Sequence, residues 1–333
     1  MLAPDGEPLM PTKASRARRW IISGKAKPLR TKLGIFAVKL NQEPSGRETQ
    51  PVVIGLDPGS KYSGVAVASQ KAILCGFNLE LPDWISKRMK QRRMLRRNRR
   101  SRKRKSRRKP KFLNRKGHKI PPSILARKQM ELRVVKELSK TYPIRAIAVE
   151  DVVYDHRRKR GGQYFSHVEV GKNWLYNELR RIAVVKLFRG QDTAKERERI
   201  GLKKTRKKSK RNPESHVTDA ISLCSLLLGE ITQTSFHFDI VRRPKYSRRK
   251  LHSELPSKGG ARKKYGGTTT PFVFRKGDYV EVRRKAGIIR GWVSGYTRNF
   301  LSISDFEWKR IGRFAISRVR LLMRNNYLLI RKR

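Results

Sequence analysis

The strongest constraint on the fold is a block of positive charge between Lys87 and Lys119. In it, 20 of 33 residues are Lys or Arg and none is Asp or Glu. Few of its residues break a helix, so a helix is predicted, but its sparse apolar residues form no stripe that could face a core. Like charges four residues apart destabilise such a helix further. The block therefore needs a partner outside it that supplies contacts and negative charge.

The whole chain is strongly basic. It has 83 Lys and Arg against 26 Asp and Glu in 333 residues, a formal net charge of +57. Because each phosphate carries one negative charge, on the order of tens of nucleotides would be needed to neutralise this excess. A large nucleic acid is the expected partner, since solubility alone does not require so much charge. Attraction to a membrane surface is an equally weak explanation.

No segment predicts export or membrane insertion. The N-terminal residues are interrupted by Pro and by charges, unlike a signal peptide. The longest apolar runs, such as Leu226–Leu228, are far too short to span a bilayer. Cys75 and Cys224 are expected to be reduced core residues of a cytoplasmic protein. Two cysteines also cannot form a four-cysteine zinc module.

The composition changes along the chain and predicts several parts. Hydrophobic residues make up 37% of the chain, below the usual range of roughly 45–50%. Some segments must therefore contribute few side chains to a hydrophobic core. The predicted parts are an N-terminal module (1–50), the first part of an α/β domain (51–86), the basic block (87–119), the rest of the α/β domain (120–240), a basic linker (241–270) and a C-terminal β domain (271–333).

The α/β domain is predicted to contain an antiparallel meander followed by one more strand. Val52–Asp57, Gly64–Ser69 and Ala72–Leu79 are short apolar runs separated by tight turns. Arg145–Glu150 has the same character and comes after the basic block. The domain is therefore expected to have a central sheet of at least four strands.

Three helices are predicted around this sheet from the 3.6-residue spacing of apolar positions. Two of them are Ile124–Tyr142 and Trp174–Phe188. The third runs from His216 to about Gly229, with Ser215 as its N-cap.

The C-terminal part is predicted to be a small β-barrel, because its short strands alternate with frequent turns. Its last two strands are Val319–Met323 and Tyr327–Ile330. Asn325 and Asn326 between them suit a tight hairpin, since Asn tolerates positive φ.

Four polar residues fall where strand ends and one helix would bring them together. Asp57 ends the first strand, Glu150 ends the fourth, and His216 and Asp219 lie three apart on the last helix, so they can face one site. Hydrolysis of a phosphodiester by two divalent ions needs carboxylates that bridge ions about 3.5–4 Å apart, and Mg²⁺ prefers oxygen ligands. Each residue alone is more typical of a cap or a solvated surface, but the ordered set predicts a metal-dependent nuclease. Asp151 is expected to point to the other side of its strand and to be structural.

Three short motifs resemble those of RuvC nucleases, which have an RNase H-like fold. Ile54–Ser60 (IGLDPGS) resembles the first motif, Ala148–Glu150 the second and His216–Ala220 the third. The basic block, with the run Arg96–Arg100 (RRNRR), resembles the arginine-rich bridge helix of RNA-guided nucleases.

Both ends of the chain extend the resemblance to the IscB and IsrB group, transposon-encoded ancestors of type II CRISPR effectors. Pro8–Pro11 resembles the PLMP motif of that group, and Phe274–Val280 the start of its C-terminal domain, which meets the target-adjacent motif. Only 65 residues separate Glu150 from His216, with no Cys pair and only the isolated His156 and His167, so no HNH nuclease is inserted there. The chain is therefore similar to IsrB, the form without HNH. It also lacks the cysteine zinc ribbon usual in the TnpB group.

The resemblance implies an RNA-guided nickase that cuts the displaced, non-target strand, while base pairing with the guide supplies sequence specificity. Asp57, Glu150 and Asp219 would hold two Mg²⁺ ions, which Mn²⁺ could replace, and His216 would assist as a metal ligand or act on the attacking water. The expected partners are a long structured guide RNA and a target double-stranded DNA, with the protein as a monomer in the ribonucleoprotein. The residues expected to bind nucleic acid are Arg92, Arg93, Arg96, Arg97, Arg99, Arg100, Arg102 and Arg104.

Two other functions stay open at this point. A non-catalytic scaffold protein for structured RNA, of ribosomal type, would explain the charge but not the ordered carboxylate motifs. A junction resolvase of RuvC type that needs no guide would require neither the basic block nor the C-terminal barrel. RNA that co-purifies with the protein helps to separate these functions: a long structured RNA of one sequence supports the guided nuclease, whereas no RNA supports the resolvase.

Overall fold

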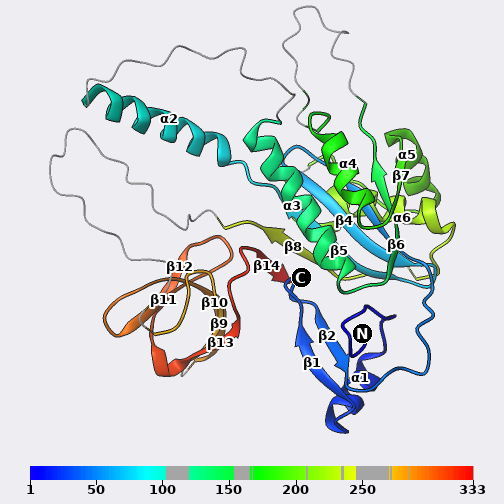
Figure 1. Ribbon diagram of the computed structural model, residues 1–333, viewed down its shortest axis with the longest axis horizontal. Helices are drawn as coiled ribbons and strands as arrows, with labels where there is room; N and C mark the ends of the chain where they lie inside the picture. Colours follow the sequence, from blue (N-terminus) through cyan, green and yellow to red (C-terminus); the bar gives the residue numbers. More distant parts are fainter. Residues whose placement is uncertain are drawn as a thin grey trace, which may run out of the picture. The chain divides into compact units, whose positions relative to one another are not determined.

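The chain forms two compact units in the computed structural model (Figure 1). The first unit comprises Met1–Asp83, Ile120–Arg242 and Ile330–Arg333, and the second comprises Trp84–Lys119 and Arg243–Leu329. The structure describes residues 1–102, 120–153, 166, 168–207, 209–233, 236–244, 270, 272–284 and 286–332. The predicted residues Arg104, His156 and His167, and most of the basic linker, lie outside these ranges.

A seven-stranded mixed sheet is the centre of the first unit, in the order β14-β8-β5-β4-β3-β6-β7. The meander β3-β4-β5 is antiparallel, as predicted. β6 is parallel to β3, β7 is parallel to β6, and β8 is parallel to β5. The strands are β3 (Val52–Asp57), β4 (Tyr62–Ser69), β5 (Ile73–Glu80), β6 (Ile144–Glu150), β7 (Val184–Phe188), β8 (Phe238–Arg242) and β14 (Leu329–Lys332).

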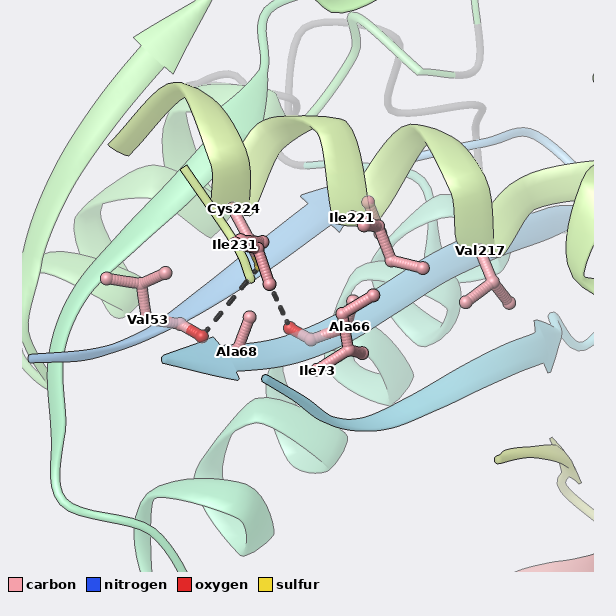
Figure 2. Close-up of a cluster of buried hydrophobic side chains, with 9 residues drawn as sticks. Val53, Ala66, Ala68, Ile73, Val217, Ile221, Cys224 and Ile231 are labelled. Carbon is pink, nitrogen blue, oxygen red and sulfur yellow. Dashed lines mark hydrogen bonds between the residues drawn. The ribbon is translucent and has the colours of Figure 1, made fainter. Parts of the chain in front are cut away.

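Helices cover both faces of this sheet, so the unit has a mixed α/β architecture (Figures 1 and 2). α3 (Pro122–Ser139) and α4 (Lys172–Arg180) lie on one face, and α6 (Pro213–Leu228) lies on the other beside α5 (Gly190–Arg199). Most apolar side chains of α3 are buried. The predicted helices Ile124–Tyr142 and His216 to about Gly229 therefore exist as α3 and α6, with bounds shifted by a few residues.

The core beneath α6 is built from small and branched side chains (Figure 2). The Cys224 thiol lies 3.9 Å from the carbonyl oxygen of Val53 and 3.7 Å from that of Ala66, and burial raises its pKa. Both cysteines are free, but only Cys224 is buried, since Cys75 is partly exposed. The buried residues of this cluster are Val53, Ala66, Ala68, Ile73, Val217, Ala220, Ile221, Cys224 and Ile231.

Two glycines allow α6 to lie unusually close to the strands. A Cβ atom at Gly55 of β3 would overlap the carbonyl oxygen of Ala220, and one at Gly64 of β4 would overlap the carbonyl oxygen of His216. No side chain fits between these strands and the helix backbone. The missing Cβ atoms therefore determine how near the first turns of α6 come to the end of β3.

The segment predicted as one helix, Trp174–Phe188, is a helix followed by a strand. α4 ends at Arg180, and the chain then forms β7. Val184 and Val185 pair with Ala146 and Ile147 of β6. The single-helix prediction was wrong because pairing with a neighbouring strand outweighed a helical spacing of apolar residues, and β-branched valines favour the strand. α5, which follows, was not predicted.

The start of the last helix also differs from the prediction. α6 begins at Pro213, a residue suited to a first helical turn, and Asn212 occupies the N-cap position. Ser215 lies inside the helix, where its hydroxyl donates to the Asn212 carbonyl oxygen at 2.8 Å and accepts from the Asn78 side chain at 2.9 Å. Ser215 is therefore not the N-cap.

The N-terminal residues of the first unit contain a helix and a two-stranded antiparallel hairpin. The helix is α1 (Ala14–Ile22), and the strands are β1 (Ala26–Arg30) and β2 (Phe36–Leu40). The sequence predicted an N-terminal module in this region, and α1 was not part of that prediction.

The second unit contains the described part of the basic block as a helix, α2 (Ile85–Arg102), in which no residue is buried. It also contains a five-stranded antiparallel sheet in the order β12-β11-β10-β9-β13. Val280, Val282, Val293, Leu301 and Ile303 form its core. The strands are β9 (Tyr279–Arg284), β10 (Gly287–Tyr296), β11 (Phe300–Ser304), β12 (Arg310–Ala315) and β13 (Val319–Met323).

The predicted C-terminal hairpin is wrong. β13 pairs with β9, and the last strand, β14, joins the sheet of the first unit beside β8. Between them, the backbone N–H of Asn325 donates to Asp278 Oδ1 at 2.7 Å, and its side-chain amide donates to the Lys276 carbonyl oxygen at 2.7 Å. These bonds hold Asn325 against the start of the domain and turn the chain away from β13. The positive φ of this segment falls on Tyr327, not on an Asn.

Across the described ranges, no helix is both long and apolar enough to cross a membrane.

The close approach of α6 can be tested at Gly55. Replacing Gly55 by Ala should lower the free energy of unfolding by about 1–3 kcal/mol, because the added methyl group overlaps a backbone carbonyl that cannot turn aside. Urea unfolding of the purified protein measures this change. Gly46→Ala is the matched control, since nothing lies within 4 Å of the added atom. Equal stability of the two variants would contradict this account of the helix–sheet contact.

Candidate active site

A cavity of about 310 Å³ lies where β3 and β6 end and α6 begins. All four residues singled out from the sequence, Asp57, Glu150, His216 and Asp219, line it. β3 and β6 are parallel neighbours, so their carboxyl ends meet at one edge of the sheet. The cavity is lined by Asp57, Pro58, Gly59, Ser60, Lys61, Tyr62, Glu150, Val152, Val168, Lys204, Ser215, His216 and Asp219.

The first turns of α6 supply two of these residues. His216 and Asp219 are three positions apart, and both are buried. His216 Nδ1 lies 3.7 Å from Asp57 Oδ2, and its ring stacks on that of Tyr62 with centroids 5.5 Å apart. The imidazole is thus held between the end of β3 and the start of β4, facing the cavity that both strands border.

Two basic side chains hold the carboxylate of Asp219. Arg197 Nη1 lies 2.6 Å from Oδ1, and Lys204 Nζ lies 2.5 Å from Oδ2. The two differ in setting: Arg197 belongs to α5 and its side chain is 15% exposed, whereas Lys204 follows the end of that helix and is 37% exposed. Sequence reasoning missed both. Both are basic residues of a strongly basic chain, and no motif or spacing distinguishes them.

The Glu150 carboxyl group has a strongly perturbed acidity. Burial, followed by the negative charges of Asp57 and Asp219, raises its pKa to about 8, although the charge of Lys204 opposes the rise. It also shares a hydrogen bond with Asp57. The first residue of α5 is close by, since a Cβ atom at Gly190 would lie 2.9 Å from Glu150 Oε1. The cavity therefore concentrates negative charge that a proton or a cation must neutralise.

The carboxylates match the donor preference of a hard divalent cation but are not arranged around one. Asp57, Glu150 and Asp219 line one cavity and offer the oxygen ligands that Mg²⁺ prefers. Within the described ranges, however, no three His, Cys, Asp or Glu side chains are placed to hold a metal ion together. The carboxylate of Asp219 is paired with Arg197 and Lys204. The side chains present fit such an ion if Lys204 moves away from Asp219 Oδ2 and leaves that oxygen to the ion.

Asp151 lies outside the cavity, although it is next to Glu150 in the sequence. Its Oδ1 accepts hydrogen bonds from Lys172 at 2.9 Å and from the Tyr176 hydroxyl at 3.0 Å. Partial burial acts to raise its pKa, but these two hydrogen bonds outweigh it and the pKa is lowered. Asp151 ties the end of β6 to α4, which is a structural role.

The arginines predicted to bind nucleic acid belong to the second unit, whereas the residues that line the cavity belong to the first. None of them is buried. Arg104 lies beyond the described part of this helix. The residues in question on α2 are Arg92, Arg93, Arg96, Arg97, Arg99, Arg100 and Arg102.

The raised pKa of Glu150 predicts a pH-dependent stability. Between its ordinary value of 4.5 and about 8, the folded protein keeps a proton on Glu150 that the unfolded chain has lost. The free energy of unfolding of the metal-free protein should therefore fall with rising pH in this window, by at most about 1.4 kcal/mol per pH unit from this group.

The variant Glu150→Gln removes this dependence. Its stability relative to the wild type should grow as the pH rises from 5 to 8, as measured by urea unfolding in the presence of EDTA. Glu48→Gln, at an exposed position, should leave the difference independent of pH. A constant difference for Glu150→Gln would show that Glu150 is not perturbed.

The chain is similar in structure to RuvC of Thermus thermophilus. The RuvC structure in complex with a Holliday junction substrate matches with 16% identity and a TM-score of 0.29, covering 52% of this chain and 90% of that one. A second Thermus thermophilus RuvC structure matches with 14% identity and a TM-score of 0.29, covering 54% of this chain and 96% of that one. A TM-score of 0.29 is too low to carry fold or function over from them.

No curated protein sequence matches the chain. A family model does match: the one described as RRXRR protein covers residues 1–172, more than half of the 333 residues. The matched part includes Asp57, Glu150 and the run Arg96–Arg100, which reads Arg-Arg-Asn-Arg-Arg. The chain belongs to the RRXRR family.

Proposed function

We propose that this protein is an RNA-guided DNA endonuclease of the IsrB type, with an RNase H-like RuvC domain that nicks the non-target strand of a guide-opened duplex. The observation that carries the proposal is the meeting of Asp57, Glu150, His216 and Asp219 at one cavity, from two strand ends and one helix far apart in the sequence. Membership of the RRXRR family and the net charge of +57 support it.

The carboxylates of Asp57, Glu150 and Asp219 would hold two Mg²⁺ ions. Such ions supply a water nucleophile at neutral pH and stabilise charge on the phosphate. His216, held between Asp57 and Tyr62, would orient the attacking water or take its proton. Arg197 would keep Asp219 in place from the side of α5, because it bonds the oxygen that Lys204 does not.

The exposed arginines of α2 would bind the guide RNA. A helix with no buried residue and no acidic side chain has nothing within itself to offset the repulsion between its charges. RNA phosphates would neutralise that repulsion, and arginine can bind phosphate oxygens with two parallel hydrogen bonds. The guide is therefore expected to stabilise α2 as well as to provide sequence specificity.

Loss of one carboxylate should stop cleavage without loss of the guide. Asp57→Asn should lower the rate of Mg²⁺-dependent nicking by more than about 100-fold, since even residues that only support a metal ligand are worth about 10–100-fold. The assay follows conversion of supercoiled target plasmid to the nicked form by the purified ribonucleoprotein. Asp83→Asn, at an exposed position of the same unit, should nick at the wild-type rate. Nicking by Asp57→Asn at that same rate would overturn the site.

Sequencing the RNA that co-purifies with the same preparations separates the proposal from its alternatives. One long structured RNA together with nicking supports the guided nuclease. The same RNA without any cleavage favours a scaffold protein, and cleavage of junctions without RNA favours a resolvase.

The arginines of α2 should contribute charge to RNA binding. Changing Arg96, Arg97, Arg99 and Arg100 to Ala should reduce the slope of log K against log salt by up to about 3, at about 0.7 for each lost phosphate contact on single-stranded RNA. Fluorescence anisotropy over a KCl series measures the slope. The matched variant with four lysines keeps the charge, so it should keep the slope and lose only affinity. An unchanged slope in the alanine variant would mean that α2 does not contact phosphates.

A further inference from the structure

We propose that Ser63, Glu131 and Lys128 form a buried relay that sets the position of the turn between β3 and β4, and through it the wall of the active-site cavity. Ser63 and Glu131 are positioning residues for the nuclease reaction, and Lys128 balances the buried charge of Glu131. The inference rests on the proposed function of the cavity. None of them lines the cavity itself.

The relay runs from α3 to the turn through short polar contacts. Lys128 Nζ lies 3.2 Å from Glu131 Oε2, one turn away on α3. The Ser63 hydroxyl of β4 donates to Glu131 Oε1 at 2.5 Å, and the backbone N–H of Gly59 donates to the Ser63 oxygen at 3.0 Å. Because the single hydroxyl proton of Ser63 is used by Glu131, its oxygen can only accept from Gly59. The direction of every bond in the relay is therefore determined.

All three side chains are out of contact with solvent. Ser63 and Glu131 are 0% exposed and Lys128 is 2% exposed. Lys128 Nζ and Glu131 Oε2 form an ion pair, but neither atom makes a hydrogen bond in the described structure. The polar groups of the pair are therefore only partly satisfied. A buried ion pair of this kind is weak as a source of stability, since apolar residues of similar size often do as well or better. Its contribution is better explained as fixing one arrangement of the groups it contacts.

The group that the relay fixes is the turn Pro58–Tyr62, whose residues all line the cavity. The turn is tight, because a Cβ atom at Gly59 would overlap the carbonyl oxygen of Tyr62. Asp57 precedes it and pairs with Gly64, directly after Ser63. Tyr62, directly before Ser63, stacks on His216. A shift of Ser63 would thus move both the carboxylate of Asp57 and the ring that supports His216.

The test compares two buried serines at opposite ends of β4. Ser63→Ala removes the relay, whereas Ser69→Ala removes a hydroxyl, on a residue 2% exposed, that bonds only the local turn at Ala72. With saturating guide and target, Ser63→Ala should lower kcat for nicking at least tenfold and leave KM for the target unchanged. Ser69→Ala should stay within twofold of the wild type. Equal losses in the two variants, or no loss in Ser63→Ala, would overturn the proposal.

Hydrogen–deuterium exchange gives a readout that does not depend on cleavage. The amides of residues 59–62 in this turn should exchange at least tenfold faster in Ser63→Ala than in the wild type, with α6 and the rest of the sheet unchanged. Unchanged exchange at the turn would overturn the relay. If the wild type does not nick at all, the proposed function fails, while this exchange measurement still decides whether the relay holds the turn.

A second pair of variants keeps the proposal testable if Ser63→Ala does not fold. Both carry Lys128→Met, and they differ only in Glu131→Gln or Glu131→Leu. Gln still accepts from the Ser63 hydroxyl, so kcat and turn exchange should stay within threefold of the wild type. Leu cannot accept, so both should change at least tenfold. Equal behaviour of the two would show that the bond from Ser63 to position 131 does not position the turn.

Discussion

The contact between α6 and the strands β3 and β4 is the constraint on which the candidate site depends. The absence of Cβ atoms at Gly55 and Gly64 lets the helix backbone rest on the strands. His216 and Asp219 therefore lie beside the end of β3, and the parallel pairing of β6 with β3 adds Glu150 at the same edge. A helix one side chain further away would leave the same residues in the same order along the chain, but without a shared cavity.

The electrostatics of the cavity follow from this crowding. Burial of Glu150, together with the negative charges of Asp57 and Asp219 beside it, raises its pKa to about 8. Asp219 is neutralised differently, by Arg197 from a helix and by Lys204 from the segment after it. Lys204 is the more exposed of the two and loses less solvent contact in its ion pair. It is thus the partner that an entering cation would displace, while Arg197 keeps the carboxylate in place.

Sequence reasoning identified the elements whose burial is continuous along the chain. β3, β4 and β6 are short apolar runs, and the ordered residues at their ends lie at one cavity as expected. It missed elements that depend on partners distant in the sequence. β7 is an exposed edge strand, and the spacing of its apolar residues also suits a helix. β14 joins a sheet whose other strands all come before Arg243 in the sequence, more than 80 residues earlier. The partners of Asp219 were missed for the same reason, since α5 must first pack on α6 before Arg197 can reach it.

The cavity and α2, the two parts of the proposed activity, are stabilised by different interactions. The cavity is held in shape by the apolar core beneath α6 and by the close contact of Gly55 and Gly64 with the α6 backbone. These contacts need no ligand, so the side chains of the cavity are in place without nucleic acid. α2 has no buried residue and a run of like charges, so under the proposed function its stability would come from the RNA phosphates it binds. Under the proposed function, the cavity would be formed before binding, whereas the order of α2 would depend on RNA. Guide binding would then be a folding step for α2, and the carboxylate cavity would need only cations and a strand to act on.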